Sequence, residues 1–456
     1  MNTPIIKALS EHAAKNYIKF HTGSRAEVST GSGMDISAGF WEWEFTELPG
    51  LDNLHCPIGA ILESEKLAAK AFGADHTLFS VNGATAAILA LVLGSCKPGD
   101  IIVVDRGCHS SVFNALVLAD VKAVLINSTY EDGIPIPQSS EIFFEAAVKF
   151  EAKGVLLTRP NYFGIAADIS NLAEDLHKAG KFLLVDEAHG AHFGFHPLLP
   201  QAALKFGADG VAQSAHKTLG ALNQTAYLHL QGNLLCPDKI ANALSMVQTT
   251  SPSYPLLASL DFARAWLETE GEERYGRLIQ GISQFWKTLN APFKPSMTSS
   301  QKDPTRLVIR TEGVNGEEVA NNLRELFNIQ VEMADTNYIV CIAVPGDEEG
   351  LIVLAEALNE IIEAESEPDE LFVREFPKTF IESIEPIDIR ASLYSKHKDV
   401  EIQESVGCIA GEFVTIYPPG VPILCPGERI SLEVAAHLYD IIKSKITIID
   451  DGGSND

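Results

Sequence analysis

Two polar residues, Asp186 and Lys217, follow short apolar runs of the chain. Asp186 comes directly after Phe182–Val185 and begins the string Asp-Glu-Ala-His-Gly-Ala-His, whereas Lys217 follows Gly210–Gln213 and ends the string Ser-Ala-His-Lys. A lysine that is desolvated at the end of a buried strand loses its preference for the charged form, and its neutral amine is a nucleophile for carbonyl groups. A carboxylate in such a place needs a positive partner, and a protonated heterocyclic nitrogen is suitable.

Each of these motifs also has an ordinary structural explanation. Taken alone, Asp186 suits the cap of a following helix and Lys217 suits a snorkelling surface lysine, while His189 and His192 suit polar residues near a helix start. Taken together, Asp186 and Lys217 meet both requirements of pyridoxal 5'-phosphate (PLP), namely a lysine that forms an imine and a carboxylate that keeps the ring nitrogen protonated. The pair therefore predicts a PLP site.

The segment Val81–Thr85 offers a seat for the phosphate of such a cofactor. It joins an apolar run to a predicted helix, and Gly83, Ala84 and Thr85 bring small side chains, backbone N–H groups and a hydroxyl to the helix start. Helix N-termini bind anions. Because Asn and Gly are common in any turn between a strand and a helix, the segment alone does not predict a phosphate site. It supports one only in combination with the other motifs.

Two more polar segments follow apolar runs. His109 comes after Ile101–Val104 and suits a ring that lies flat against a planar cofactor, but it also suits a helix-start histidine beside Ser110 and Ser111, the candidate helix caps. Thr158–Gly164 supplies hydroxyl, amide and phenol groups, as surface loops also do. Convergence of all five segments on one site is the simpler explanation.

That convergence requires the apolar runs to be neighbouring strands of one sheet. Their continuous apolar character is typical of strands that are covered on both faces. The predicted strands are Thr77–Val81, Ile101–Val104, Ala123–Ile126, Gly154–Leu157, Phe182–Val185, Gly210–Gln213 and Ala226–Leu230. The predicted helices between them are Glu63–Phe72, Ala84–Gly94, Ser110–Leu118, Ile142–Glu151, Ile169–Ala179 and Leu198–Phe206. The alternation predicts an α/β fold with a mostly parallel sheet, whose ligands bind beyond the carboxyl ends of the strands.

The rest of the chain divides around this unit. We predict an N-terminal segment at 1–54, a large domain at 55–290 that ends in a long helix at Leu256–Leu289, and a smaller α+β C-terminal region at 291–456. The boundary near 290 is a segment rich in Pro, Ser, Lys and Thr. The C-terminal region contains the Pro-Gly cluster Tyr417–Pro422, which is typical of a stiff extended loop.

Composition limits the partners of the protein. The 456 residues carry 34 Lys+Arg against 61 Asp+Glu, and the net charge of −27 excludes nucleic acid as a main partner. Seven widely spaced cysteines without a C-x-x-C pair indicate no metal site and no disulfide framework, which favours a reducing cytoplasm. We see no signal peptide and no apolar run near the ~20 residues that span a bilayer. We therefore expect a soluble protein that does not associate with a membrane.

The strings around Asp186 and Lys217 are similar to those of the PLP-dependent ornithine/lysine/arginine decarboxylase family, which has the aspartate-aminotransferase fold (fold type I). The resemblance extends over nearly the whole chain and includes the segments at 47–55, 72–75, 81–83, 250–254, 417–422 and 426–428. It implies a decarboxylase of lysine, arginine or ornithine and a homodimer with shared active sites, into which the segment 47–55 of the neighbouring subunit reaches. The length is similar to that of the short members of the family.

The resemblance also implies a role for each site residue. Lys217 would carry the cofactor, Asp186 would bind the pyridine nitrogen, and His109 would stack on the ring. Ala188 would lie on the opposite face of the ring with His189 beside it. The residues expected to hold the phosphate are Gly83, Ala84, Thr85, Ser214 and His216. The catalytic residues would thus be Lys217, Asp186, His189 and His109.

Two departures from the family pattern leave the substrate open. Relatives have His-x-Pro-Gly-His-Lys where this chain has His21–Arg25, and His-Lys-Ser where it has His109-Ser110-Ser111. Glu412 and Glu428 are candidates for the distal cation of a basic substrate, and each also suits an ordinary surface acid. The alternative functions are a PLP-dependent aminotransferase or lyase, a catalytically silent paralogue with a binding or regulatory role, and a structural protein without cofactor.

Overall fold

The computed structural model describes residues 18–20, 52–131, 133–290, 293–295, 302–311, 314–364, 385–416, 421–442 and 445–450. The predictions for His21–Arg25, for residues 47–51 and for Tyr417–Gly420 lie outside these ranges. Within them, a sheet of seven strands has the order β2-β10-β9-β8-β7-β3-β4. Its strands are β2 (His76–Ser80), β3 (Ile101–Asp105), β4 (Lys122–Ile126), β7 (Gly154–Thr158), β8 (Phe182–Asp186), β9 (Gly210–Ser214) and β10 (Ala226–Leu230).

Six of these strands run in the same direction. The pairs β4–β3, β3–β7, β7–β8 and β8–β9 are parallel, and β10 is antiparallel to both of its neighbours, β9 and β2. The predicted mostly parallel sheet is thereby confirmed. Its parallel strands end at one edge, where Asp105, Thr158, Asp186 and Ser214 are the last residues of β3, β7, β8 and β9.

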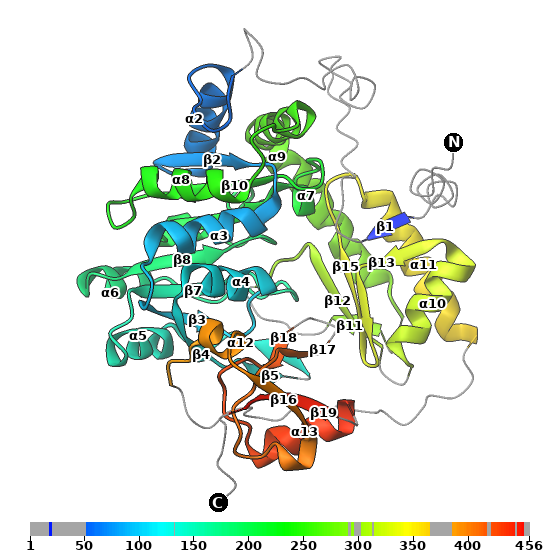
Figure 1. Cartoon of the computed structure of the whole chain (residues 1–456). Helices are drawn as coiled ribbons and strands as arrows, with labels where there is room; N and C mark the ends of the chain where they lie inside the picture. Colours follow the sequence, from blue (N-terminus) through cyan, green and yellow to red (C-terminus); the bar gives the residue numbers. More distant parts are fainter. Residues whose placement is uncertain are drawn as a thin grey trace, which may run out of the picture.

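Helices cover both faces of the sheet (Figure 1). One face packs against α3 (Gly83–Ser95), α4 (Ser110–Ala119) and α8 (Pro237–Val247), and the other packs against α2 (Ala60–Phe72), α5 (Ser140–Lys149), α6 (Leu172–Lys178) and α9 (Tyr254–Thr288). Successive side chains of each strand point to opposite faces of the sheet. One core cluster contains Val103, Val155 and Leu183, and the cluster on the other face contains Val104, Leu156 and Leu184. Burial on both faces explains the continuous apolar runs in the sequence.

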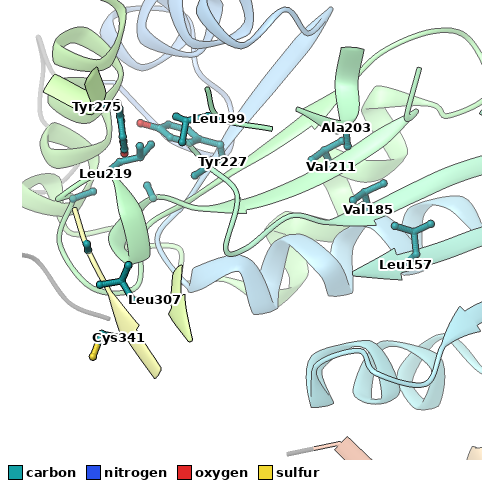
Figure 2. Packing of buried hydrophobic residues seen from close by; sticks show 14 of the residues in the cluster. Leu157, Val185, Leu199, Ala203, Val211, Leu219, Tyr227, Tyr275, Leu307 and Cys341 are labelled. Atoms are coloured by element: carbon teal, nitrogen blue, oxygen red, sulfur yellow. The ribbon is translucent and has the colours of Figure 1, made fainter. Parts of the chain in front are cut away.

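A smaller sheet lies beside the large one (Figure 1). Its order is β11-β12-β15-β14 and all of its pairs are antiparallel. The strands are β11 (Phe293–Pro295), β12 (Arg306–Thr311), β14 (Met333–Asp335) and β15 (Tyr338–Ile342), with α10 (Gly316–Phe327) and α11 (Glu348–Ala364) beside them. Figure 2 shows that Leu307 of β12 and Cys341 of β15 belong to the same apolar cluster as Val185 and Val211 of the large sheet. The two sheets therefore share a core.

The C-terminal segment forms a third packed region below β4 (Figure 1). It contains α12 (Ile389–Leu393), β16 (His397–Glu401), β17 (Val414–Ile416), β18 (Val421–Leu424), α13 (Leu432–Ile442) and β19 (Lys445–Ile449). Ile387 forms a bridge with Ala123 of β4, and Arg106 pairs with Glu428. These contacts fix the C-terminal segment against the edge of the large sheet.

Several local predictions differ from the structure, including α2, which begins at Ala60 rather than at Glu63, and α8, which was not predicted. The predicted helix Leu198–Phe206 is only a 3-10 turn, η2 (Ala203–Phe206), because Pro200 lacks an N–H group and disfavours helical backbone at Leu199. Helix α6 begins at Leu172 rather than at Ile169. A hairpin of β5 (Thr129–Glu131) and β6 (Ile134–Ile136) was not predicted. Within the described ranges, every helix is too short or too polar to cross a bilayer.

Candidate active site

A cavity of about 500 Å³ opens at the carboxyl edge of the large sheet. It is bordered by the ends of β3, β7, β8 and β9 and by the first residues of α3 and α4. All ten residues predicted for the site line this cavity, namely Gly83, Ala84, Thr85, His109, Asp186, Ala188, His189, Ser214, His216 and Lys217. Their roles remain predictions, but the structure brings all of them together.

Lys217 lies in the short helix α7 (Ala215–Thr218), which follows β9. Its Nζ is 2.9 Å from Nε2 of His189. Burial of the amine lowers the pKa of Lys217, Asp186 opposes this shift by stabilising the ammonium, and Arg306 adds to it by repulsion. The surroundings therefore shift Lys217 toward the neutral amine, which is the nucleophilic form.

Asp186 ends β8 and is 3% exposed. Its Oδ1 accepts a hydrogen bond from the Ala188 N–H at 3.1 Å. Burial raises the pKa of Asp186, while the nearby Lys217 and His109 lower it. The proposed alternative, that Asp186 caps a following helix, is wrong, because the described backbone after β8 is a series of turns. A carboxylate whose burial disfavours its charge is suited to a cationic ligand in the cavity.

His189 is 8% exposed and lies between two side chains that carry positive charge in water. Its Nε2 faces Lys217 at 2.9 Å, and its Nδ1 is 2.8 Å from Nη2 of Arg306. Burial, followed by repulsion from Lys217 and Arg306, holds the pKa of His189 well below its ordinary value. His192 is also buried, but it lies away from the cavity and pairs with Asp303 at 3.2 Å.

His109 is exposed toward the cavity and is itself the N-cap of α4. Its Nδ1 accepts a hydrogen bond from the Ser111 N–H at 3.2 Å and lies 2.9 Å from the Ser111 hydroxyl. The expectation that Ser110 or Ser111 caps this helix is therefore wrong. The cap fixes the imidazole at the cavity wall, and burial lowers the pKa of His109 despite the opposing charge of Asp186.

The N-terminus of α3 forms another part of the wall. The first amides of a helix have no partner within the helix, and Ala84 and Thr85 lie in this first turn. Gly83 has a φ of +74°, and a Cβ there would meet no atom within 4 Å, so the backbone is open to the cavity. Ser214 and His216 stand opposite on β9 and α7, with the Ser214 hydroxyl 3.1 Å from His216 Nδ1. Free amides, hydroxyls and an imidazole suit an anion.

Several cavity residues escaped the sequence analysis. Asp105 ends β3, accepts a hydrogen bond from the Gly107 N–H at 3.0 Å, and has a pKa that burial raises to about 6. Pro135 and Pro137 come from the unpredicted hairpin, and Phe413, Thr415 and Pro422 come from the C-terminal segment. Arg306 lies behind His189 and has no signal in the sequence, since an arginine at the start of a predicted strand resembles a surface residue.

The two carboxylates suggested for a distal cation lie elsewhere. Glu428 is 5% exposed, forms a bidentate ion pair with Arg106, and also accepts the Cys425 N–H at 2.8 Å. Glu412 accepts the Thr447 N–H at 2.6 Å. Neither lines the cavity. Glu428 is thus neither a surface acid nor a free ligand, and both acids serve the C-terminal fold.

Comparison with known proteins identifies the family. Residues 3–297 match the model of the Orn/Lys/Arg decarboxylase major domain, and residues 371–443 match that of the Orn/Lys/Arg decarboxylase C-terminal domain. The chain belongs to the Orn/Lys/Arg decarboxylase family. It is therefore an amino-acid decarboxylase, as the resemblance predicted.

Relatives within this decarboxylase family extend over nearly the whole chain. An arginine decarboxylase of Bacillus subtilis (strain 168) is 36% identical over 96% of this chain and 93% of its own length. The crystal structure of a Francisella novicida lysine decarboxylase has a TM-score of 0.75 with 19% identity, over 96% of this chain and 80% of that one. An alanine–glyoxylate aminotransferase of Nostoc sp. has a TM-score of 0.60 with 15% identity, over 75% of this chain and 95% of that one. The decarboxylase thus has the aminotransferase-like fold.

Proposed function

We propose that the protein is a PLP-dependent decarboxylase that converts a basic amino acid into its amine and CO₂. The observation that carries this proposal is the meeting of Lys217 and Asp186 at one cavity, with the α3 N-terminus on the same wall. Arginine is the first substrate to test, because the B. subtilis arginine decarboxylase is similar over nearly the full length. Lysine and ornithine are the other members of the substrate class.

The cavity residues fit PLP in kind and in place. A buried carboxylate whose pKa is raised suits a protonated ring nitrogen, and an amine whose pKa is lowered suits an aldehyde. Amides at a helix N-terminus suit a phosphate, and Gly83 leaves the approach to them open. The cavity volume of about 500 Å³ is within the range of sites that hold a small ligand.

We assign the binding roles as follows. Gly83, Ala84, Thr85, Ser214 and His216 hold the phosphate group. Asp186 would hold the ring nitrogen, and His109 and Ala188 would contact the ring. Lys217 attaches the cofactor. When bound, PLP supplies an electron-poor ring that accepts the electron pair released with CO₂.

The protein's own groups then control orientation and protons. Asp186 must stay charged, because a neutral ring nitrogen accepts electrons poorly, and a cationic N–H at the carboxylate offsets the cost of its burial. The proton that replaces CO₂ at the α carbon would come from the ammonium form of Lys217 or the imidazolium form of His189, whose Nζ and Nε2 atoms lie 2.9 Å apart, because the neutral forms of both groups are too weakly acidic. Phe163, Phe413 and the two hairpin prolines give the cavity apolar walls, which would limit the access of water to the reacting carbon.

We further propose a homodimer in the cytoplasm. All seven cysteines are free in the structure, in accord with a reducing compartment. Of the segment 47–55, the structure describes residues 52–55, which precede α2, and there Asp52 accepts N–H groups of Ile58 and Gly59. Light scattering of the purified protein tests the dimer.

The decisive test of the reaction is product analysis. Purified protein loaded with PLP is offered arginine, lysine and ornithine, and evolved CO₂ and keto acid are measured, with Lys217→Ala as the control. We expect CO₂ and the corresponding amine from one of the three, and neither from the control. Keto acid without CO₂ would instead indicate an aminotransferase. Bound cofactor without any product would indicate a silent paralogue.

A further inference from the structure

Arg306 is a buried arginine directly behind the cavity. It is 1% exposed, begins β12, and donates from Nη2 to His189 Nδ1 at 2.8 Å. Its Nε and Nη1 have no hydrogen-bond partner among the described residues. A guanidinium with this little solvation is costly, so its single strong contact calls for an explanation.

Packing fixes the position of this arginine. Gly164 has a φ of +82°, and a Cβ there would lie 2.6 Å from Cβ of Arg306, so the strand can approach the loop only because residue 164 is glycine. The Arg306 N–H bonds the Asp303 carbonyl at 3.2 Å, and its guanidinium lies 5.8 Å from the ring centre of Tyr162. The packing of the small sheet therefore restricts the Arg306 guanidinium to a position next to His189.

The contact fixes the tautomer of His189. A guanidinium has five N–H donors and no acceptor, so Nδ1 of His189 must accept from Arg306. The single proton of the neutral imidazole then lies on Nε2, which faces the Lys217 amine at 2.9 Å. An Nε2–H donates to Lys217 only when Nζ has a lone pair, which is the neutral amine.

We propose that Arg306 is a positioning residue that holds the proton of His189 on Nε2, so that a neutral imidazole donates a hydrogen bond to the Lys217 amine and orients it. This inference rests on the proposed function, because it gives Lys217 and His189 their roles in one reaction. It adds a residue of the small sheet that does not line the cavity.

The charged groups around His189 all act in one direction. Lys217, Arg306, His109 and His216 each lower the pKa of His189, in addition to its burial. The acids in the neighbourhood face the cations instead, since Asp186 and Glu332 act on Lys217, and Asp303 and Glu332 act on Arg306. Without Arg306, His189 would lose a donor and a repelling charge, and its pKa would rise, although burial and Lys217 would still hold it below its ordinary value.

The test is the visible absorbance of the bound cofactor, without substrate, followed from pH 5.5 to 9. We compare the wild type with Arg306→Met, Arg306→Lys and Arg310→Met, which changes an arginine at the far end of the same strand. We expect an additional transition in the acidic part of this range in Arg306→Met only, and the double variant Arg306→Met/His189→Gln should lose it. Arg306→Lys, which keeps the charge and a donor, should titrate as the wild type does.

Two results would overturn the proposal. One is an Arg306→Met titration identical to that of the wild type with only a raised KM, which would make Arg306 a substrate-binding group. The other is a new transition that persists in the double variant. Should Arg306→Met fail to fold, Arg306→Gln replaces it, because this variant keeps a donor without the charge. We expect its absorbance transition to shift in the same direction by a smaller amount. A transition that does not shift would contradict the proposal.

Failure of the proposed function gives a different result. If the wild type binds no PLP, the proposed function fails, and the tautomer is then read in the cofactor-free protein by nitrogen-15 NMR of labelled histidines. The His189 signals are those missing in His189→Gln. We expect a proton on Nε2 in the wild type and a mixture of tautomers in Arg306→Met, and a proton on Nδ1 in the wild type would overturn the inference.

Discussion

Two regions of the molecule bury charged side chains in opposite ways. At the junction with the C-terminal segment, Arg106 and Glu428 form a bidentate pair, and Arg106 Nε also bonds Asn127 at 2.6 Å. At the cavity, Asp186 has a pKa that burial raises and Lys217 has one that burial lowers, so neither charge is fully compensated by the protein. The first region is complete as it stands, whereas the second needs a ligand.

The contrast also holds between two adjacent residues. Glu187, next to Asp186, accepts hydrogen bonds from Arg159, Gln213 and the Ala203 N–H, and it does not line the cavity. In the string Asp-Glu-Ala-His, Glu187 thus stabilises the fold, whereas Asp186 lines the cavity. Burial also raises the pKa of Glu187, to about 7, so the two acids differ in their partners and in their position relative to the cavity rather than in the direction of their pKa shifts.

The largest effect should come from Lys217→Ala at the cavity. Removal of the amine removes both the covalent attachment of the cofactor and a proton donor. We expect decarboxylation to fall below detection and the visible absorbance of the imine between lysine and cofactor to disappear, measured by CO₂ release and by spectrophotometry. Persistence of either signal would place the cofactor lysine elsewhere.

The next effect should come from Asp186→Asn. An amide cannot keep the ring nitrogen protonated, so we expect turnover to fall by orders of magnitude while the cofactor stays bound. The melting temperature should change little, because the carboxylate is not part of a paired network. Calorimetry and steady-state kinetics on the same sample check both statements, and an equal loss of stability would contradict the comparison.

Glu428→Gln should show the opposite pattern. It leaves Arg106 buried without its anion, and breaking a buried pair costs about 3–5 kcal/mol of folding free energy. Denaturant unfolding measures this loss, and the folded fraction should still bind PLP. Arg429→Gln, which changes the exposed neighbour and removes only its hydrogen bond to the Gly407 carbonyl, is the matched control and should cost at most about 1.5 kcal/mol. Loss of PLP absorbance from folded Glu428→Gln would mean that the junction takes part in the site.

The smallest effect concerns Glu65, a buried acid of α2 that accepts the Phe79 N–H and whose pKa burial raises to about 8. The folded protein binds a proton that the unfolded chain has already lost, so this contribution to stability is complete below about pH 4.5 and is lost as pH rises toward 8. Relative to Glu65→Gln, the wild type should lose at most about 1.4 kcal/mol per pH unit between pH 6 and 8. Equal slopes in thermal melts of the two proteins would contradict the assignment.

Much of this architecture is visible in the sequence because burial on both faces leaves a simple pattern. The seven predicted strands agree with the structure to within one residue at their ends, and polar residues placed after them do converge on one cavity. Helix prediction failed at Leu198–Phe206, where Pro200 outweighs the apolar spacing. Apolar runs and helix-breaking prolines, both of which are local features of the sequence, are therefore sufficient to predict most of the large sheet and its helices.

Contacts between distant segments could not be predicted in this way. Nothing near Arg306 in the sequence reports that the small sheet will bury its guanidinium against His189, 117 residues earlier in the chain. Likewise, Glu428 reads as a surface acid until the fold places it on Arg106. Residues from outside the large sheet reach the site through packing between distant elements. The periodicity and spacing of apolar residues do not predict such packing.

The most direct test of the central claim is to find which lysine carries the cofactor. Protein loaded with PLP is reduced with borohydride, which makes the attachment permanent, and is then digested and mapped by mass spectrometry. We predict the added mass on the peptide that contains Lys217 and on no other, with its yield unchanged in Asp186→Asn. A modified lysine outside the cavity, or no modified peptide at all, would contradict the account.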